Sequence, residues 1–426
     1  MSRRGRNPNA NPGVRPIQRI ELNEKPSRKR YILIIVLVAI ALVAFGVGLF
    51  NYLYTPGGWT RITPTSNTAY TCSDEMILYY ELGASGRSAN AENRAISNRY
   101  AELCHEAYVI FSADQAFDGE LNLHHVNANA GEPVSVHPAL YKALQKAVEQ
   151  GGRWIFAAPY YTAYRNLFTA PEDAFAAEQD PTRDGEIAAY FAEIAAFVSD
   201  ESHIRLEFLE DNRLRLMVSD AYRAFAAENG IEQYIDLYWA KNAFVVDYIA
   251  DALQSDGFVY GYLASYDGFT RNLDPRDTEF GVNVSTLHEG RGYTALQYVY
   301  RGQTAMVSLR AFPLSDADER YYAYRDGEIR NAYVDVTDGV SRASADALVA
   351  YATDGKGCTD VLFSVLPLWI SDKEITGTAL AAFAETADGV ELIVANGTRY
   401  THTEKDAALT ILPYKGVTFT KEFVNE

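Results

Sequence analysis

Residues 235–247 read Ile-Asp-Leu-Tyr-Trp-Ala-Lys-Asn-Ala-Phe-Val-Val-Asp. The residues up to Leu237 predict a short apolar strand, and apolar residues at helical spacing then predict a helix that ends near Leu253. The segment is therefore a strand-to-helix junction. Because it joins the two element types directly, it is a first indication of a protein that mixes helices with strands.

The length and composition of the chain indicate a large globular protein. Its 426 residues are 48% hydrophobic and 22% charged, which is enough apolar material for one large core or two ordinary ones. Residues 1–30 carry nine Lys or Arg and two Glu, a surplus of +7, and the net charge of -18 leaves -25 on the remaining residues. So acidic a body excludes nucleic acid as a partner, because phosphate backbones need a cationic surface.

Residues 32–50 form a run of nineteen residues without a charged side chain. As a helix this run would be about 29 Å long, which spans the apolar core of a bilayer. A cleavable signal peptide has a shorter apolar run of about 7–15 residues and a small-residue cleavage site, whereas Asn-Tyr-Leu-Tyr-Thr-Pro follows Phe50. The run therefore predicts an uncleaved transmembrane signal anchor, with a buried core helix as the alternative.

The basic residues Arg28, Lys29 and Arg30 decide the orientation that we expect for this anchor. No comparable basic cluster follows the apolar run, so the positive-inside bias keeps the N-terminus in the cytoplasm and the body outside it. We expect a single-pass protein of the cell membrane. Its predicted parts are a basic, disordered cytoplasmic tail (1–30), the anchor (31–54), a linker (55–66) and one extracytoplasmic domain (67–426).

The cysteines and histidines do not predict a metal site. Cys72, Cys104 and Cys358 lack the Cys-x-x-Cys spacing of zinc sites. Outside the cell one pair of them could form a disulfide, and buried free thiols are the alternative. His124 and His125 are adjacent, and adjacent side chains on a strand point to opposite faces.

The pattern of elements predicts an α+β fold. Helical spacing covers residues 90–111, 138–149 and 185–198, and residues 204–218 have the alternation of a hairpin. Residues 391–402 predict a second hairpin, in which Asn396-Gly397 is expected to form a type I′ turn. Helices and strands do not alternate regularly along the chain, which favours α+β over a parallel βαβ arrangement.

The junction at residues 235–247 resembles a motif of the ApbE-type flavin transferases, the FAD:protein FMN transferases. The family motif has the form Ile-Asp-Leu-Gly-Gly-Ile-Ala-Lys-Gly-Tyr-Ala-Val-Asp, and the two segments align without a gap. Residues 335–339 resemble the family's Asp-Pro-x-Thr-Gly, and residues 359–364 resemble its Ala-Asp-Ala-Leu-Ala-Thr. Residues 111–131 and 154–168 match two further landmarks in the same order. The resemblance implies an ApbE-like, T-fold-related mixed domain that follows the N-terminal transmembrane helix.

The resemblance also implies a reaction, two cofactors and a set of site residues. The family transfers FMN from FAD to a Ser or Thr of an acceptor protein and requires Mg²⁺. Asp360 and Ser364 match its metal-binding residues, and their i, i+4 spacing puts both on one face of a helix. Asp360 could instead stabilise the first turn of that helix, with Ser364 an incidental residue. The flavin contacts that the resemblance implies are Asn242, Asp247, Asp267, Gly268, Asp335 and Gly339.

Several residues of the family pattern are replaced in this chain. Tyr238 and Trp239 stand in place of two glycines, Asn242 in place of a lysine, and Ala332 in place of a histidine. Bulky side chains prevent the close approach of backbone to ligand that glycine permits. Two hypotheses follow. The protein is a membrane-anchored, extracytoplasmic, Mg²⁺-dependent flavin transferase with eroded motifs, or it is a catalytically inactive relative that acts as a binding or interaction module of the cell envelope.

Overall fold

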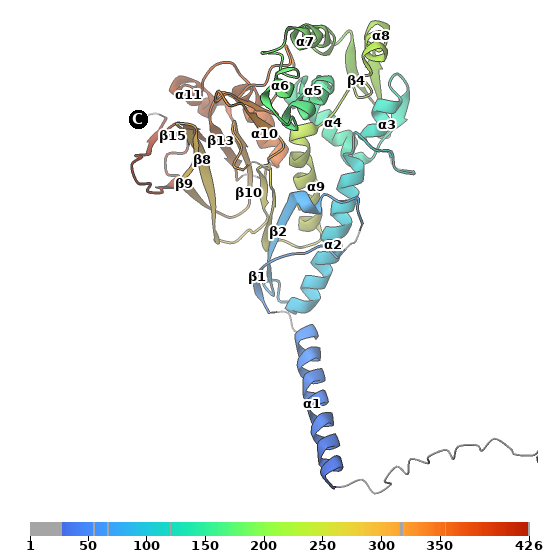
Figure 1. The fold of residues 1–426 in the computed structure, drawn as a ribbon, viewed down its shortest axis with the longest axis vertical. Coiled ribbons are helices and arrows are strands. Elements are labelled where there is room, and N and C mark those ends of the chain that lie inside the picture. Colours follow the sequence, from blue (N-terminus) through green and yellow to red (C-terminus); the bar gives the residue numbers. More distant parts are fainter. Residues whose placement is uncertain are drawn as a thin grey trace, which may run out of the picture. The chain divides into compact units, whose positions relative to one another are not determined.

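The computed structural model describes residues 28–53, 56–65, 68–119, 121–315, 318–353 and 355–424 (Figure 1). Of the tail that the sequence predicts, residues 1–27 lie outside this described part of the chain. The chain divides into two compact units, residues 1–55 and residues 56–426. Residues 56–424 are called the body below.

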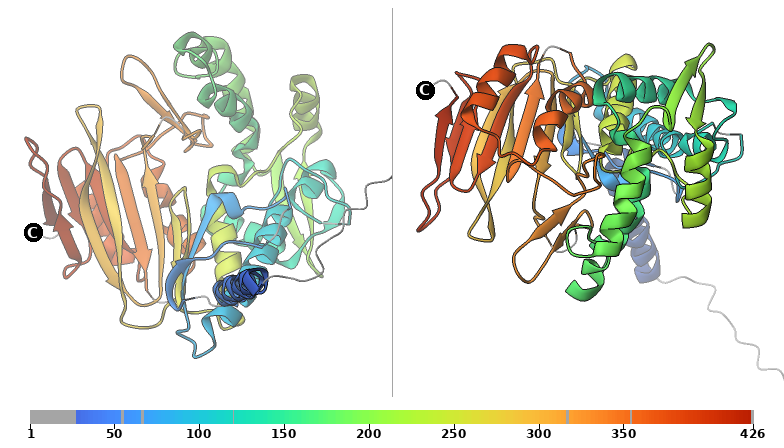
Figure 2. Two further views of the ribbon diagram at one scale, coloured as in Figure 1. Left: turned by 60° about the horizontal axis from the view of Figure 1, so that its bottom comes forward. Right: turned by 90° about the horizontal axis from the view of Figure 1, so that it is seen from above.

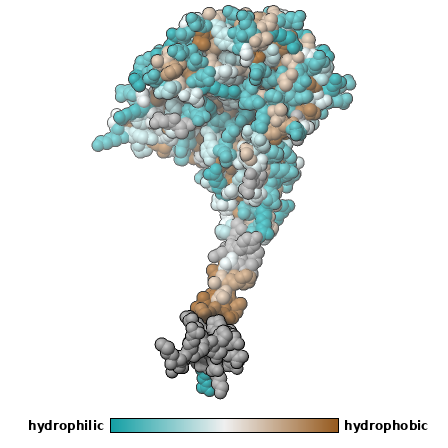
Figure 3. All heavy atoms as spheres, turned by 45° about the vertical axis from the view of Figure 1, so that its right-hand side comes forward, coloured by the Kyte–Doolittle hydropathy of each residue, from teal (hydrophilic) through white to brown (hydrophobic). Residues whose placement is uncertain are grey.

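The described part of the first unit is the helix α1 (Arg28–Leu53). Residues 28–48 have a mean hydropathy of 2.9, and all of their side chains are exposed. The part of α1 that is visible in Figure 3 is covered by apolar side chains, drawn in brown. The prediction of one N-terminal helix that is long and apolar enough to cross a membrane is therefore confirmed.

A nine-stranded sheet forms the centre of the body (Figures 1 and 2). Its neighbouring strands pair antiparallel, except that β15 pairs with β17 in parallel. The strands lie in the order β1 (Gly58–Arg61), β2 (Met76–Leu82), β6 (Gly261–Ser265), β7 (Phe269–Asn272), β10 (Thr304–Arg310), β13 (Ala347–Ala352), β14 (Glu391–Asn396), β15 (Arg399–His402) and β17 (Thr420–Phe423).

Both faces of this sheet are covered, as the sequence of β13 shows. Leu348 and Ala350 enter one hydrophobic core, whereas Val349 and Tyr351 enter another. Successive side chains of a strand point to opposite faces. A strand that is apolar at every position is therefore buried on both sides, and the body has three layers.

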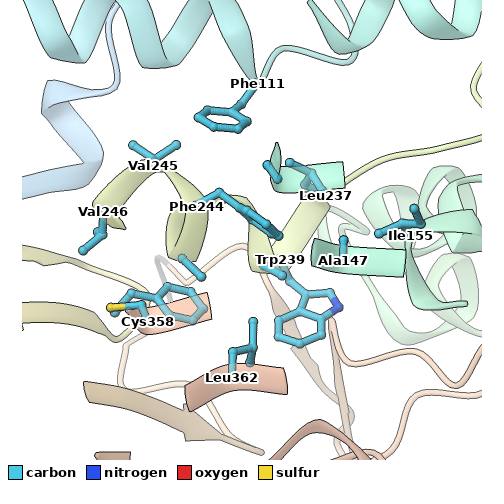
Figure 4. Packing of buried hydrophobic residues seen from close by; sticks show 14 of the residues in the cluster. Phe111, Ala147, Ile155, Leu237, Trp239, Phe244, Val245, Val246, Cys358 and Leu362 are labelled. Carbon is cyan, nitrogen blue, oxygen red and sulfur yellow. The ribbon is translucent and has the colours of Figure 1, made fainter. Parts of the chain in front are cut away.

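Three helices cover one face of the sheet: α2 (Ala89–Ile110), α9 (Lys241–Ser255) and α10 (Cys358–Trp369). The helix α9 contacts β6 and β7 as well as α2 and α10, so it lies at the centre of this layer. In Figure 4, Phe244 of α9 and Leu362 of α10 point into the same apolar space as Trp239. The junction at residues 235–247, which leads into α9, is thus the central packing element of the body.

A second, three-stranded sheet covers the opposite face, in the order β16 (Ala408–Ile411), β9 (Arg291–Arg301) and β8 (Glu279–His288). Aromatic side chains join the two sheets. The rings of Tyr298 and Tyr351, one from each sheet, lie 4.5 Å apart.

The remaining elements complete the body. Their starts follow local sequence signals: Asp184 accepts the N–H of Ile187 at 3.0 Å and begins α7, as an N-cap residue does. These elements are α3 (Leu123–Ala128), α4 (Pro138–Gly151), α5 (Ala158–Phe168), α6 (Asp173–Ala177), α7 (Gly185–Val198), α8 (Asp220–Asn229), α11 (Gly377–Thr386), the sheet of β3 (Pro133–Ser135), β5 (Arg213–Val218) and β4 (Ile204–Leu209), the ribbon of β11 (Tyr321–Ala323) and β12 (Ile329–Asn331), and the short 3₁₀ turns η1 (Ser73–Glu75), η2 (Trp154–Ala157) and η3 (Tyr238–Ala240).

Three details differ from the sequence predictions. Residues 58–61 of the predicted linker form β1, because they pair with β2 as an edge strand. Residues 235–237 are buried but form no strand, and the 3₁₀ turn η3 leads into α9 instead. The hairpin at residues 391–402 is present, but Asn396 pairs with Arg399, so that its loop is Gly397-Thr398. Of these two loop residues only Gly397 has positive φ, +57°, which is not a type I′ turn.

All three cysteines are buried free thiols. The pKa of Cys72 is raised mainly by its hydrogen bond with Cys104 and also by burial. Burial raises the pKa of Cys358. Since the thiolate is the reactive form, we expect the folded protein at pH 8 to react with a thiol reagent more than about tenfold more slowly than the urea-unfolded protein. Labelling followed by mass spectrometry measures both rates. Equal rates would contradict this burial.

Candidate functional site

The side chains that the sequence assigned to one flavin site lie in three places. Asn242 and Asp247 are both on α9, but their separation of five residues turns them about 140° apart around the helix axis. Asp247 lines a cavity together with Asp360, called the Asp360 cavity. Asn242 lines another cavity together with Asp267, called the Asn242 cavity. Asp335 and Gly339 belong to a loop that lines neither of them.

The Asp360 cavity lies between α4, α9 and the start of α10 and has a volume of about 630 Å³. Phe111, Phe244 and Tyr248 provide aromatic walls. Three cationic side chains, Lys142, Lys146 and Arg271, line it together with three carboxylates, Asp247, Asp251 and Asp360. Lys146 and Arg271 are paired with these carboxylates, so the aromatic walls and Lys142 are the features that suit an aromatic ligand with an anionic group.

Asp247 holds the first turn of α10. Its carboxylate accepts the backbone N–H groups of Cys358 at 2.7 Å and Thr359 at 2.9 Å. It also accepts the Thr359 hydroxyl at 2.7 Å and forms an ion pair with Arg271 at 2.9 Å. A carboxylate at the start of a helix satisfies N–H groups that have no partner within the helix. These contacts explain Asp247 as a residue that joins α9 to α10.

Asp360 and Ser364 are engaged with protein atoms. Lys146 Nζ lies 2.7 Å from Asp360 Oδ1, and the Gly357 N–H donates to Asp360 Oδ2 at 2.9 Å. The Ser364 hydroxyl donates to the Asp360 carbonyl oxygen in the same helix at 2.9 Å. Both carboxylate oxygens of Asp360 therefore have donors, and one of these donors is a cation.

These contacts test the magnesium site that the resemblance implies. Mg²⁺ needs oxygen ligands at about 2.0–2.1 Å in octahedral geometry. Here the ammonium group of Lys146 lies against the carboxylate that would face the metal. Within the described ranges, no group of three or more His, Cys, Asp or Glu side chains could hold a metal ion. Asp360 and Ser364, as they are arranged, do not fit Mg²⁺.

Tyr238 and Trp239 fill the corner where the resembled motif has glycines. Tyr238 has φ +33° and stacks on Tyr161 with 4.2 Å between ring centroids, and burial raises the pKa of Tyr238 to about 12. Trp239 is 4% exposed and packs edge to face with Tyr333 at 5.0 Å. Figure 4 shows its indole inside the core near Ala147. At these two positions bulky side chains therefore occupy the space that the glycines of the resembled motif would leave beside the backbone.

The Asn242 cavity has a volume of about 460 Å³. Asn242 Nδ2 donates to Glu75 Oε2 and to Asp267 Oδ2, both at 2.9 Å. Burial raises the pKa of Asp267. Arg310 and Arg320 also line this cavity, so that it combines carboxylate, amide and guanidinium groups.

Gly268, at the turn between β6 and β7, is required by packing. Its φ is +108°, and its carbonyl accepts the Ser308 N–H at 2.8 Å. A Cβ at this position would collide with the Ser308 carbonyl oxygen of β10. The need for glycine here is therefore explained by the sheet itself.

Asp335 and Gly339 form a loop that is held by its own contacts. Asp335 accepts the Thr337 N–H at 2.9 Å and forms an ion pair with Arg342 at 3.1 Å. Gly339 has φ +74°, and its carbonyl accepts the Tyr164 hydroxyl at 2.9 Å. Both residues have structural partners within the loop or beneath it.

The sequence did not indicate three important side chains of these cavities: Lys146, Arg271 and Arg310. A signal for Lys146 was present, because Lys142 and Lys146 are i, i+4 neighbours on α4 and both line the Asp360 cavity. Arg271 and Arg310 are on strands of the nine-stranded sheet. Their roles follow from strand pairing between distant segments, which no local pattern reveals.

The solved structures that resemble this chain include those of two ApbE proteins. The ApbE protein from Thermotoga maritima has a TM-score of 0.51 at 13% identity, and the alignment covers 84% of this chain and 97% of that protein. The flavin transferase ApbE from Vibrio cholerae has a TM-score of 0.50 at 16% identity, with coverage of 84% and 97%. Neither a protein-family model nor a curated protein matches the sequence. The predicted α+β fold is confirmed, and the chain has the fold of the ApbE flavin transferases in a divergent form.

Proposed function

We propose that this chain is a membrane-anchored, extracytoplasmic relative of the flavin transferases that binds a flavin nucleotide but does not transfer FMN in a Mg²⁺-dependent reaction. The observation that carries the proposal is the ion pair between Lys146 and Asp360, at 2.7 Å. A resident ammonium group neutralises the carboxylate on which a divalent cation would depend, and the two cations would repel each other. The fold, which resembles that of an ApbE flavin transferase, supports the choice of ligand class.

The Asp360 cavity has the chemistry for a flavin nucleotide. The aromatic rings of Phe111, Phe244 and Tyr248 offer surfaces for a flat ring system, and Lys142 lies where it can meet phosphate oxygens. The cavity volume of about 630 Å³ lies within the usual range for small-molecule sites.

The replaced residues support a protein that keeps the fold of the flavin transferases but does not carry out the transfer reaction. The motif glycines have become Tyr238 and Trp239, and Trp239 is packed into the core. Ala332, in place of a histidine, is 2% exposed and has no group that can carry a proton. Transfer to an acceptor hydroxyl needs a group to remove its proton, and Ala332 does not supply one.

Mg²⁺-dependent transfer of FMN from FAD to a Ser or Thr of an acceptor protein is the second candidate. Two observations favour it. Asp360 lines the cavity with Ser364 one turn further along α10, and the Lys146 side chain is 27% exposed, so it could move away from Asp360. FAD and Mg²⁺ would then be the cofactors, and a partner protein would be the flavin acceptor.

The location follows from α1. Its apolar residues suit a single membrane pass, and the basic residues Arg28, Lys29 and Arg30 before them support a cytoplasmic N-terminus by the positive-inside rule. Residues 1–30 are then the cytoplasmic tail, and residues 67–426 belong to the extracytoplasmic domain. Because β1 begins at Gly58, this domain also includes the strand in the segment before residue 67.

Binding of flavin to the full-length protein in detergent tests the proposal. FAD should bind equally well with Mg²⁺ or EDTA present, and FAD at about 100 times its Kd should stabilise the protein by about 2.7 kcal/mol. Flavin fluorescence and thermal unfolding measure the two effects. If neither changes at millimolar FAD, flavin binding is wrong.

The variant Lys142→Ala tests the orientation of the ligand. It should weaken FAD binding about tenfold, because one charge-assisted contact with phosphate is lost. Riboflavin has no phosphate, so its binding should not change. Lys373→Ala, an exposed lysine of the loop before α11, is the control variant. An equal effect of Lys142→Ala on FAD and riboflavin would contradict this placement.

A further inference from the structure

The Asn242 cavity contains buried polar atoms that have no partner. Asn242 is only 5% exposed, yet its Oδ1 accepts no hydrogen bond from the described residues. The same holds for Asp267 Oδ1 and Arg310 Nη1. All three side chains line the one cavity of about 460 Å³. Because buried polar atoms are nearly always paired in folded proteins, three unpaired atoms at one cavity point to a ligand.

The contacts of Asn242 fix which of its atoms is available. Its Nδ2 donates to carboxylates of Glu75 and Asp267 at 2.9 Å each. A carboxylate can only accept, so the nitrogen must be the atom that faces both. Oδ1 is then the unpaired atom, and a ligand that satisfies it must bring a hydrogen-bond donor.

Two guanidinium groups, those of Arg310 and Arg320, also line the Asn242 cavity. Asp318 joins Arg310 at 3.5 Å and Arg320 at 3.0 Å, and Arg320 Nη1 lies 3.8 Å from Asp267 Oδ2. Arg310 Nη1 remains an unpaired donor, which needs an acceptor oxygen. The cavity thus requires donors beside Asn242 and Asp267 and an anionic acceptor beside Arg310.

Two exposed apolar side chains stand among the residues that line this cavity. Tyr266 is 56% exposed and Leu314 is 59% exposed, and both belong to its lining. They offer an apolar surface next to the polar walls. A ligand with charged groups at one end and an apolar side chain would satisfy both parts of the cavity.

We propose that the Asn242 cavity binds a zwitterion that carries an ammonium group and a carboxylate, as in a free α-amino acid or a short peptide with apolar side chains. The ammonium group meets Asn242 Oδ1 and Asp267 Oδ1, and the carboxylate meets Arg310 Nη1. The apolar side chain lies against Tyr266 and Leu314. This site goes beyond the proposed flavin site and uses other residues, so either can fail without the other.

Calorimetric titration of the full-length protein in detergent, without flavin, tests the site with leucine and leucyl-leucine as probes. At least one probe should bind. The probe that binds more tightly shows whether the ligand is a free amino acid or a short peptide. The N-acetyl derivative of the tighter probe lacks the ammonium group and its methyl ester lacks the carboxylate, so each should bind about 10- to 100-fold more weakly than that probe. The site is wrong if neither probe binds at 10 mM, on the order of the weakest affinity of interest, or if the N-acetyl derivative binds as well as its parent probe.

Variants locate the binding. Asn242→Leu and Arg310→Gln should each weaken the better probe about 10- to 100-fold. Arg301→Gln is the matched control, because Arg301 pairs with exposed Asp277 and Glu279 at the end of β9, and it should leave binding unchanged. The comparison of the tighter probe with its two derivatives needs no variant, so it tests the site even if Asn242→Leu does not fold. Unchanged binding in folded Arg310→Gln protein would overturn the assignment.

Discussion

The substitution Asp247→Ala is expected to lower the free energy of unfolding of the body by about 3–5 kcal/mol. It removes the buried partner of Arg271, whose side chain is 10% exposed, and the acceptor for the Cys358 and Thr359 N–H groups. Among the described residues, the buried cation would keep only the exposed Asp251 as its carboxylate partner, and the two N–H groups at the start of α10 would be left unpaired. Urea unfolding of the full-length protein in detergent, followed by tryptophan fluorescence, measures the loss.

Asp251→Ala is the control for this substitution. Asp251 also pairs with Arg271, at 3.0 Å, but its side chain is 68% exposed. An exposed pair contributes about 0–1 kcal/mol, so the control should remain close to the wild type. Similar losses for the two variants would show that Asp247 is only one surface charge among others.

Gly268→Ala is expected to cost about 3–5 kcal/mol of stability. The new Cβ would collide with the Ser308 carbonyl oxygen, and this oxygen belongs to β10, a central strand that pairs on both sides. The strand cannot move away without breaking sheet hydrogen bonds. The residue would also be held at φ +108°, which a side chain disfavours.

Gly290→Ala separates the collision from the backbone strain. Gly290 has φ +73°, and a Cβ there would meet nothing within 4 Å. Its substitution should cost about 1–2 kcal/mol, the strain of a left-handed residue alone. Equal losses for Gly268→Ala and Gly290→Ala would mean that the contact with β10 does not matter.

The elements that could be predicted from the sequence are those with local signals. The helix α7 was predicted over residues 185–198, and the structure has it as Gly185–Val198, because an N-cap and a helical apolar pattern lie within one segment. The hairpin of β4 and β5 likewise follows from alternation on both sides of a short turn.

The strand expected at residues 235–237 shows where local patterns fail. Ile235 and Leu237 are fully buried, and burial alone makes a short segment look like a strand. The backbone of Ile235 is paired with the Asn127 side chain instead of a neighbouring strand. That partner is distant in sequence, so no pattern within the segment could indicate it.

In the candidate site, too, the deciding contacts come from segments that are distant in sequence. The spacing of Asp360 and Ser364 was compatible with a metal site and with a helix start, and the sequence left both open. The decision rests on Lys146, which comes from α4 and meets Asp360 only through the tertiary fold. The unpaired atoms of the Asn242 cavity are also visible only in three dimensions.

In our proposal, the ion pair of Lys146 and Asp360 excludes metal-dependent transfer, and the protein still binds flavin. The most direct measurement is intact mass spectrometry of a flavin-acceptor domain after incubation with the full-length protein, FAD and Mg²⁺. We predict that the wild-type protein binds FAD but leaves the acceptor mass unchanged. Addition of FMN to the acceptor by the wild-type protein, abolished by Asp360→Ala, would contradict the account.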